Sequence, residues 1–222
     1  MPRRFCTPLD GAGPLAIFGA GGHGREIAWL ARECFGEGTA LTFVVDHQES
    51  VEKSINGIGV MQLEDFAHRH PGSQVVVAIG DPLSRERSAA KCRAAGLRFV
   101  SLLHPRVEVS PWISLGEGCV VCAGSVLTAN LVLGLHVHVN VMCSVSHDVN
   151  IGDFSTLSPG VHIAGWVTMG QRVFIGTGAS IKNGSRDRPI VIGDDAIIGA
   201  GACVIGDVEP ETTVAGVPAR TT

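Results

Sequence analysis

Residues 127–157 read LTANLVLGLHVHVNVMCSVSHDVNIGDFSTL, and an aliphatic residue returns at every sixth position of this stretch. Counting by sixes in both directions extends the column to thirteen consecutive aliphatic residues, a run that chance would produce with a probability on the order of one in a million. The thirteen are Val109, Leu115, Val121, Leu127, Leu133, Val139, Val145, Ile151, Leu157, Ile163, Met169, Ile175 and Ile181. The column skips five residues and resumes at Ile192, Ile198 and Val204.

The hexads carry a second column of small or apolar residues, four positions after each aliphatic one. A period of six matches neither an α-helix nor a simple strand, and it predicts short strands joined by tight corners, with three hexads in each coil of a triangular prism. Residues 18 apart then stack about 4.8 Å apart, the spacing of neighbouring strands. The five extra residues, within 182–189, should leave the prism as a loop. A solenoid of another kind is the alternative.

The composition agrees with a narrow interior and excludes several classes of protein. The 222 residues include 29 glycines and no tyrosine. The net charge is −4 with Lys and Arg scattered, which argues against nucleic-acid binding. No signal-peptide core and no run of about 18 apolar residues is present, so we expect a cytoplasmic protein that does not bind membranes.

The chain has seven cysteines, and this odd number indicates free thiols rather than a set of disulfides. The C-x-x-C at 119–122 is interpreted as structural rather than as a zinc or redox site.

Residues 14–105 follow a different pattern. We expect buried strands at 15–18, 41–45, 74–79 and 98–103, separated by helices at 25–34, 62–70 and 82–95. This alternation predicts an open parallel sheet. The sequence therefore predicts two domains, an α/β half-Rossmann domain over residues 1–105 and a parallel β-helix over residues 106–222.

A glycine-rich turn follows the first predicted strand. Its G-x-G-x-x-G pattern consists of Gly19, Gly21 and Gly24, with Gly22 and His23 between them. Such a turn cradles phosphate at a helix N-terminus, and an acidic residue at the end of the second strand, here Asp46, reaches a ribose or base. Because about 90 residues suffice for only one mononucleotide half, we predict a single nucleotide, as in a nucleotide sugar, over a dinucleotide or a purely structural turn. His23 is a candidate for contact with a phosphate.

One histidine of nine stands out by its place in the repeat. His147 lies at a predicted corner of the prism and is followed directly by Asp148. Eighteen residues further on is Gly165, so the imidazole should lie beside a backbone N–H that no side chain shields. A histidine held by a carboxylate, next to a free donor, suits direct acyl transfer, because it supplies a base for the nucleophile and a donor for the oxyanion. A surface histidine without a role is the alternative.

A metal site is the other use of histidines on such a prism, as in zinc-dependent carbonic anhydrases. The candidates are His136, His138, His147 and His162. The H-x-H pair should point to opposite faces of its strand, and His147 and His162 are not 18 residues apart. We therefore predict no metal.

Several segments together resemble the sugar O-acyltransferase family, typified by the sialic acid O-acetyltransferase NeuD and by nucleotide-4-amino-sugar N-acetyltransferases such as PglD. These segments are residues 17–24 (IFGAGGHG), 43–46 (FVVD), 78–81 (AIGD), 104–105 (HP), 146–153 (SHDVNIGD) and 215–220 (AGVPAR). The resemblance covers nearly the whole chain, and it implies left-handed coiling, which composition does not predict.

The resemblance also implies roles for individual residues. His147 would be the general base, Asp148 its partner, and the Gly165 N–H the contact to the acetyl carbonyl. Acetyl-CoA, the co-substrate, would lie along the prism wall of a homotrimer, with active sites between subunits. The residues expected near acetyl-CoA are Gly165, Thr156, Lys182, Arg186, Pro218 and Arg220. Those expected near the nucleotide sugar are Gly19, Gly21, Gly22, His23, Gly24, Asp46 and His47.

Two positions depart from the family pattern. Thr156 stands where the bacillosamine-type enzymes carry a second histidine, nine residues after the base. The second strand ends in Asp46-His47, where the family often has Asp-Asp, and this change leaves the base preference of the nucleotide site open.

Three functions compete on the sequence. The first is acetyl-CoA-dependent N-acetylation of a nucleotide-linked 4-amino sugar for bacterial surface glycans. The second is O-acetylation of a sialic-acid-like sugar, which would use the same histidine. The third is a non-catalytic β-helix scaffold, which the intact His147-Asp148 pair disfavours.

Overall fold

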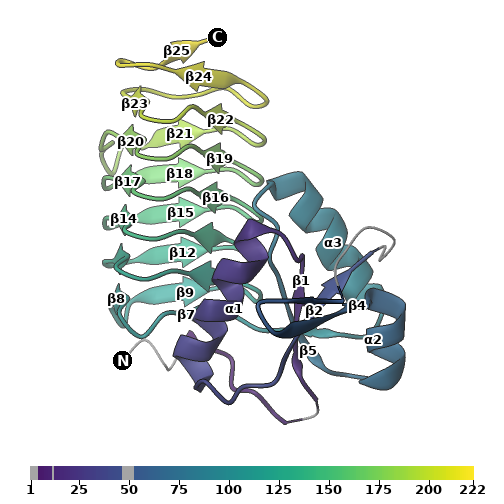
Figure 1. The fold of residues 1–222 in the computed structure, drawn as a ribbon. Coiled ribbons are helices and arrows are strands. Elements are labelled where there is room, and N and C mark those ends of the chain that lie inside the picture. Colours follow the sequence, from purple (N-terminus) through teal and green to yellow (C-terminus); the bar gives the residue numbers. More distant parts are fainter. Residues whose placement is uncertain (1–4, 12, 47–52) are drawn as a thin grey trace.

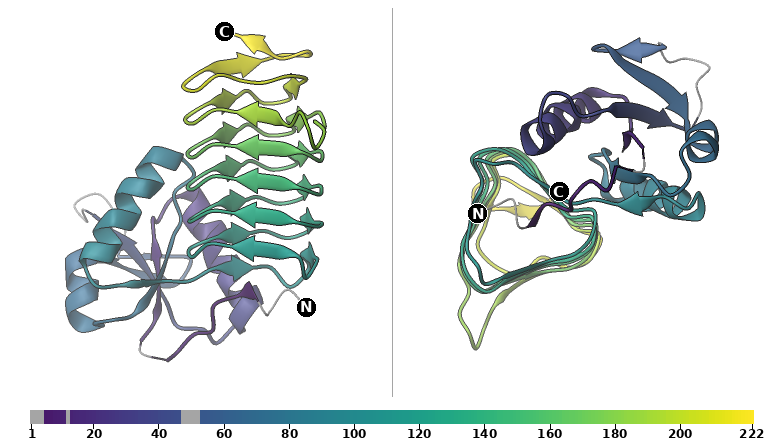
Figure 2. Two further views of the ribbon diagram at one scale, coloured as in Figure 1. Left: turned by 180° about the vertical axis from the view of Figure 1, so that it is seen from behind. Right: turned by 90° about the horizontal axis from the view of Figure 1, so that it is seen from below.

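The computed structural model describes residues 5–11, 13–46 and 53–222. Two parts lie side by side: an α/β domain and a tall triangular β-helix, with the domain packed against the lower coils of the prism (Figures 1 and 2). The C-terminus lies at the upper end of the prism.

The α/β domain is built on one twisted sheet with the strand order β3-β4-β2-β1-β5-β6. Its strands are β1 (Leu15–Phe18), β2 (Leu41–Val45), β3 (Ser54–Ile55), β4 (Ile58–Gln62), β5 (Gln74–Val77) and β6 (Arg98–Phe99). Its helices are α1 (Gly22–Phe35), α2 (Leu63–Arg69) and α3 (Pro82–Ala94). All neighbouring strands are parallel except the β3–β4 hairpin. The predicted open parallel sheet is thereby confirmed.

Strand β1 explains why the sheet carries helices on both faces. All four residues of β1 are buried. Leu15 and Ile17 pack in one cluster with side chains of α1, while Ala16 and Phe18 pack in another with side chains of α2 and α3. A strand covered on both faces is continuously apolar, as the sequence LAIF is.

The structure differs from the predicted elements in two places. The expected strand at 98–103 is two strands, since β6 ends at Phe99 and β7 (Leu102–Leu103) pairs with the prism strand β10. The chain thus enters the β-helix at Leu102, ahead of the expected boundary at residue 105. The β3–β4 hairpin was not predicted, although its turn, Asn56-Gly57, is a strong hairpin signal between apolar residues.

The prism is a left-handed parallel β-helix with three faces. The first face holds β7, β10 (Val120–Val121), β13 (His138–Val139), β16 (Thr156–Leu157), β19 (Phe174–Ile175), β22 (Ile197–Ile198), β24 (Thr213–Ala215) and the antiparallel β25 (Arg220–Thr221). The second face holds β8 (Glu108–Val109), β11 (Val126–Leu127), β14 (Ser144–Val145), β17 (His162–Ile163), β20 (Ser180–Ile181) and β23 (Cys203–Val204). The third face holds β9 (Ile113–Leu115), β12 (Leu131–Leu133), β15 (Val149–Ile151), β18 (Val167–Met169) and β21 (Ile190–Ile192).

The register confirms the repeat. Ser144 pairs with His162 and His162 with Ser180, each 18 residues on, whereas Ser180 pairs with Cys203 because the five extra residues leave the prism. The aliphatic column forms the core, and from Val121 to Ile181 each of its members is at most 3% exposed. The loop at 182–189 projects from the corner between the second and third faces, on the side of the prism turned away from the α/β domain (Figure 2).

A buried arginine side chain connects the α/β domain to the first face of the prism. The Arg85 side chain of α3 is fully buried, and its guanidinium donates to the carbonyls of Ile79, Gly80, His136, Phe154 and Ser155. Burial lowers the pKa of Arg85 to about 9. The side chain hydrogen-bonds to backbone carbonyls of both domains, so it fixes how they sit together.

None of the helices in the described part of the chain is long and apolar enough to cross a membrane.

Candidate functional site

The candidate base lies at the corner between the second and third faces, directly after β14. The Nδ1 atom of His147 is 2.8 Å from the Oδ2 atom of Asp148. Asp148 adopts a left-handed backbone conformation, with φ 57°, and this tight corner turns its carboxylate back toward the preceding imidazole. The His147 side chain is 55% exposed, so a proton held on Nδ1 leaves Nε2 as an acceptor for an outside group.

Gly165 lies one coil above His147, as the 18-residue stacking predicts. A Cβ at residue 165 would lie 2.5 Å from Cε1 and 2.7 Å from Nε2 of the imidazole, so only glycine fits. The Gly165 N–H donates to no acceptor within the described part of the chain, whereas the Gly165 carbonyl accepts from Gly184. A free backbone donor thus adjoins the imidazole.

Hydrogen bonds to its carboxylate lower the pKa of Asp148. The largest contribution is the bond with His147, followed by the Asn130 amide, and the Arg186 guanidinium of the 182–189 loop adds to the effect. An ionised Asp148 stabilises the imidazolium that forms when His147 takes a proton. The dyad and the adjacent N–H are therefore arranged for proton removal and oxyanion stabilisation.

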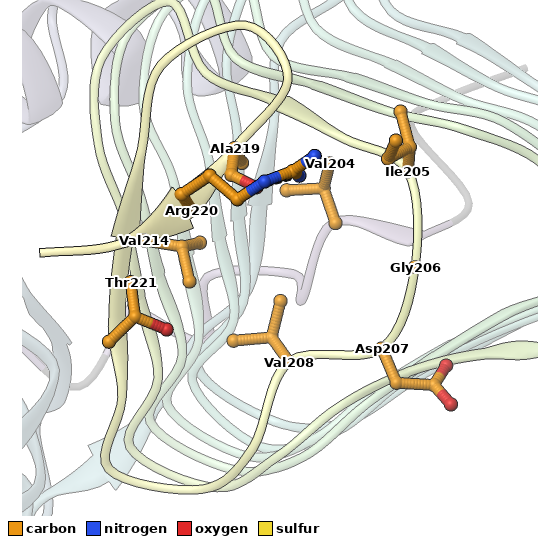
Figure 3. A pocket seen from close by; sticks show the side chains of 9 residues that line it. All are labelled: Val204, Ile205, Gly206, Asp207, Val208, Val214, Ala219, Arg220 and Thr221. Carbon is orange, nitrogen blue, oxygen red and sulfur yellow. Dashed lines mark hydrogen bonds between the residues drawn. The ribbon is translucent and has the colours of Figure 1, made fainter.

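Two cavities flank the 182–189 loop and the C-terminal tail. One, of about 470 Å³, lies between the loop and the 205–207 turn, and Lys182 and Arg188 line it. The other, of about 220 Å³, lies at the upper end of the prism, where the side chains of Val204, Val208 and Val214 point inward and Arg220 reaches across (Figure 3). The two share residues 205–207, so the loop and the tail border one continuous region.

The other residues expected near acetyl-CoA fall in different surroundings. Pro218 is exposed on the tail, next to the second cavity. Thr156 is 2% exposed, and its hydroxyl donates to the Gly80 carbonyl inside the contact between the two domains. A hydroxyl that is buried and already hydrogen-bonded cannot contact acetyl-CoA, so Thr156 is no longer a candidate for the acetyl-CoA site.

The glycines of the glycine-rich turn are of two kinds: some are required by the backbone, and others have free space around them. A Cβ on Gly24 would lie 2.0 Å from the Gly19 carbonyl, and Gly19 itself has φ 111°, so both glycines are required by the backbone. Apart from adjacent residues and the backbone of α1 itself, a Cβ on Gly21 would meet nothing within 4 Å, and one on Gly22 would meet only the Arg25 guanidinium at 3.8 Å. Gly21 caps α1 without a side-chain hydrogen bond. The N–H groups of this helix end are therefore open to a ligand.

His23 and Asp46 have protein partners. The Nε2 atom of His23 is 3.2 Å from Nδ1 of the buried His138, and its Nδ1 is 3.1 Å from Oε2 of Glu26. Asp46 forms an ion pair with Lys91, at 2.6 Å between Oδ2 and Nζ. His47 lies outside the described residues. The roles of His23, Asp46 and His47 toward a nucleotide stay predictions.

The predicted site residues fall into two groups on opposite sides of the chain. The His147 corner carries the 182–189 loop one coil above Gly165, and that loop points away from the α/β domain (Figure 2). The glycine-rich turn, in contrast, faces the first face through the His23–His138 contact. One copy of the chain does not bring the base and the nucleotide turn together.

The described residues hold no group of three or more His, Cys, Asp or Glu arranged to bind a metal ion. His136 meets Phe99 of β6 edge-on, with ring centroids 4.5 Å apart, and His138 contacts His23, so both histidines of the H-x-H pair belong to the domain interface. The C-x-x-C cysteines lie in separate clusters, Cys119 inside the prism and Cys122 against α1. Both thiols are buried among apolar side chains, where they contribute to packing.

Two functional candidates escaped the sequence reasoning. Asn130 donates to Asp148 and lies 18 residues before it, so the 18-residue spacing was the signal that could have found it. A cavity of about 570 Å³ lies between the start of α3 and the first face, lined by Gly80, Asp81, Arg172 and Phe174, among others. Gly80 and Asp81 follow β5, the strand beside β1, where open parallel sheets bind ligands.

Family models match both halves of the chain. The PglD N-terminal domain matches residues 14–92, and the hexapeptide repeat of succinyl-transferase matches residues 113–129 and 167–205. Among characterised relatives, the GDP-perosamine N-acetyltransferase of Escherichia coli O157:H7 is 34% identical over 210 residues, which cover 92% of this chain and 94% of the relative.

Two solved structures agree with this chain over nearly its whole length. WeeI from Acinetobacter baumannii AYE superposes with a TM-score of 0.89 at 31% identity, covering 94% of this chain and 99% of WeeI. PerB from Caulobacter crescentus, solved in complex with CoA and GDP-perosamine, superposes with a TM-score of 0.84 at 31% identity, covering 97% of this chain and all of PerB.

Proposed function

The chain belongs to the family of PglD-type, hexapeptide-repeat acetyltransferases, and from this we infer that it transfers the acetyl group of acetyl-CoA to the amino group of a nucleotide-linked 4-amino sugar. The first acceptor to consider is GDP-perosamine, because one relative is named for this activity and PerB was solved with GDP-perosamine and CoA.

The observation that carries the proposal is the arrangement of His147, Asp148 and Gly165. The imidazole is paired on Nδ1 and open on Nε2, and the backbone of Gly165, whose N–H has no acceptor among the described residues, adjoins the ring one coil above. Amide formation from a thioester needs both groups, a proton acceptor for the attacking amine and a donor for the carbonyl oxygen as it gains charge.

The transfer is direct. The neutral amine attacks the thioester carbonyl, Nε2 of His147 accepts a proton from the amine, and the Gly165 N–H donates to the oxyanion. The tetrahedral intermediate then collapses, the C–S bond breaks, and the CoA sulfur leaves as the thiol with the proton from the imidazolium. Asp148 stabilises the charged imidazole throughout.

Acetyl-CoA fits the region between the 182–189 loop and the C-terminal tail. Lys182, Arg186 and Arg220 bring positive charge to this part of a chain whose net charge is −4, and the CoA nucleotide is strongly anionic. Gly165 and the exposed Pro218 belong to the same proposed acetyl-CoA surface.

The nucleotide of the acceptor fits the open end of α1. Gly21 and Gly22 leave room for a phosphate at that helix end, and the cavity beside Gly80 and Asp81 lies at the neighbouring strand end. Asp46, which directly follows β2, and His47, the next residue in the sequence, remain proposed contacts of the nucleotide.

A homotrimer completes the site. Because the base and the nucleotide turn lie on opposite sides of one chain, the acceptor amine reaches His147 only if a neighbouring copy supplies one of the two. A closed ring of three prisms would repeat this contact three times.

We place the enzyme in the cytoplasm, in keeping with seven cysteines that form no disulfide in the structure.

The decisive experiment is a thiol-release assay with acetyl-CoA and a panel of acceptors: GDP-, UDP- and dTDP-linked 4-amino sugars, the matching sugars without the amino group, and sialic acid. We expect turnover with a 4-amino sugar and none with its deaminated control. Turnover of sialic acid alone would replace N-acetylation by O-acetylation, and no turnover of any acceptor would contradict the proposal.

A further inference from the structure

The corner that carries His147 continues one coil lower, where Asn130 lies beneath Asp148. The Nδ2 atom of Asn130 donates to Oδ1 of Asp148 at 3.0 Å. Both residues have left-handed backbones, with φ 56° at Asn130 and 57° at Asp148. Asparagine adopts this conformation more readily than most residues, so the corner holds the amide where it meets the carboxylate.

Asp148 therefore has a separate partner on each carboxylate oxygen. Oδ1 accepts from Asn130, and Oδ2 pairs with Nδ1 of His147 at 2.8 Å. Rotation of the carboxylate about its Cβ–Cγ bond would break both contacts. The side chain of His147 is 55% exposed, and besides its bond to Asp148 its ring meets Trp166 edge-on, with ring centroids 6.1 Å apart.

We propose that Asn130 is a positioning residue for acetyl transfer: it orients Asp148 so that His147 keeps its proton on Nδ1 and presents Nε2 to the acceptor amine. The inference rests on the proposed function, in which His147 is the base. Asn130 itself touches neither substrate, and it neither gains nor loses a proton in the reaction.

The competing explanation is that Asn130 only shapes the corner, and two substitutions separate the alternatives. Asn130→Gly removes the amide but keeps a residue that adopts φ 56° without cost. Asn130→Asp keeps the shape and replaces the donor by a second carboxylate beside Asp148. Met142→Gly is the matched control, since Met142 lies in the same coil as His147, has φ 58° and is 64% exposed at another corner.

The kinetic test measures kcat, KM and the thermal midpoint of the full-length enzyme. For Asn130→Gly we expect kcat to fall about fivefold to tenfold, with both KM values within about twofold of the unsubstituted enzyme and a thermal midpoint like that of Met142→Gly. For Asn130→Asp we expect the acid limb of the kcat–pH profile to move to higher pH, because a second carboxylate favours the protonated imidazole. A kcat for Asn130→Gly equal to that of the unsubstituted enzyme overturns the proposal, and so does a change confined to KM or to the thermal midpoint.

A second measurement does not depend on turnover. The ring carbon and nitrogen shifts of His147, assigned by their loss in His147→Gln, report which nitrogen carries the proton. We expect the Nδ1–H form in the unsubstituted protein and a shift toward the Nε2–H form in Asn130→Gly. An unchanged tautomer overturns the inference. If no amino sugar is turned over, the proposed function fails, while the shift still shows that Asn130 orients the pair.

Discussion

Gly165 leaves no room for a side chain above His147, because a Cβ at residue 165 would lie 2.5 Å from Cε1 of the imidazole. The substitution Gly165→Ala should push the ring away from the acceptor amine, whose proton it must accept. We expect kcat to fall about a hundredfold, as for a reacting group displaced by about 1 Å, with a thermal midpoint near that of the unsubstituted enzyme. Gly59→Ala is the control, since its Cβ would meet nothing within 4 Å. Equal kcat values for the two variants would contradict the assigned geometry.

The base assignment predicts the behaviour of His147→Gln. Without the imidazole nothing accepts the proton of the amine, so kcat should fall by about 10² to 10⁴. Calorimetric binding of CoA should be largely unchanged, because the proposed CoA region lies around the 182–189 loop and the tail. The matched control is His162→Gln: His162 is an exposed histidine on the second face, hydrogen-bonded to Ser144. If His147→Gln kept a normal kcat, another residue would have to be the base.

Two glycines of the nucleotide turn should separate binding from folding. Gly21→Ala places a methyl group where no protein atom lies within 4 Å, so we expect normal stability but a KM for the nucleotide sugar raised about tenfold or more, with the KM for acetyl-CoA unchanged. Gly24→Ala would collide with the Gly19 carbonyl and should lower the thermal midpoint. Equal KM values for Gly21→Ala and the unsubstituted enzyme would place the phosphate elsewhere.

Arg85 should be the main link between the domains. Replacing it by methionine leaves up to five carbonyls without their donor, and we expect the free energy of unfolding in urea to fall by about 2–4 kcal/mol. Arg87→Met, two residues further along α3 and exposed, is the control and should change it little. A loss no larger than that of the control would show that apolar packing alone fixes the interface.

The domain interface should also weaken in acid. Burial lowers the pKa of His136 from its ordinary 6.5 to about 4, so between these values the unfolded chain binds more protons than the folded one. Stability is therefore complete above pH 6.5 and declines as the pH falls toward 4, by up to about 3 kcal/mol from this residue. Burial lowers the pKa of His138 in the same direction.

His136→Phe tests this. Phe154 occupies the same corner one coil above, at φ 59°, so a phenyl ring suits the site. Thermal midpoints measured from pH 7.5 to 4.5 should decline less steeply in this variant, whereas the control His68→Phe, at an exposed site on α2, should follow the unsubstituted protein. Parallel curves for His136→Phe and the unsubstituted protein would mean that His136 does not carry the acid sensitivity.

The sequence by itself determined the prism. The period of six survives in the register of every face, and the 18-residue stacking placed Gly165 above His147 because each coil holds three hexads. The same rule led to Asn130 beneath Asp148 only after the structure showed the hydrogen bond, since stacking gives the position of a residue but not the direction of its side chain. Local repeats are readable because each coil contacts only its neighbours.

Only the tertiary structure decided how the two domains meet. Nothing in the spacing of Thr156, His138 or Arg85 revealed that all three would be buried in one interface, because their partners lie 50 to 120 residues away in sequence. Because Thr156 is buried in that interface, it is no longer a candidate for contact with acetyl-CoA, and His23 has a protein partner there. It also put the α/β domain on the side of the prism turned away from the His147 corner, and the proposal of a site shared between copies of the chain rests on this separation.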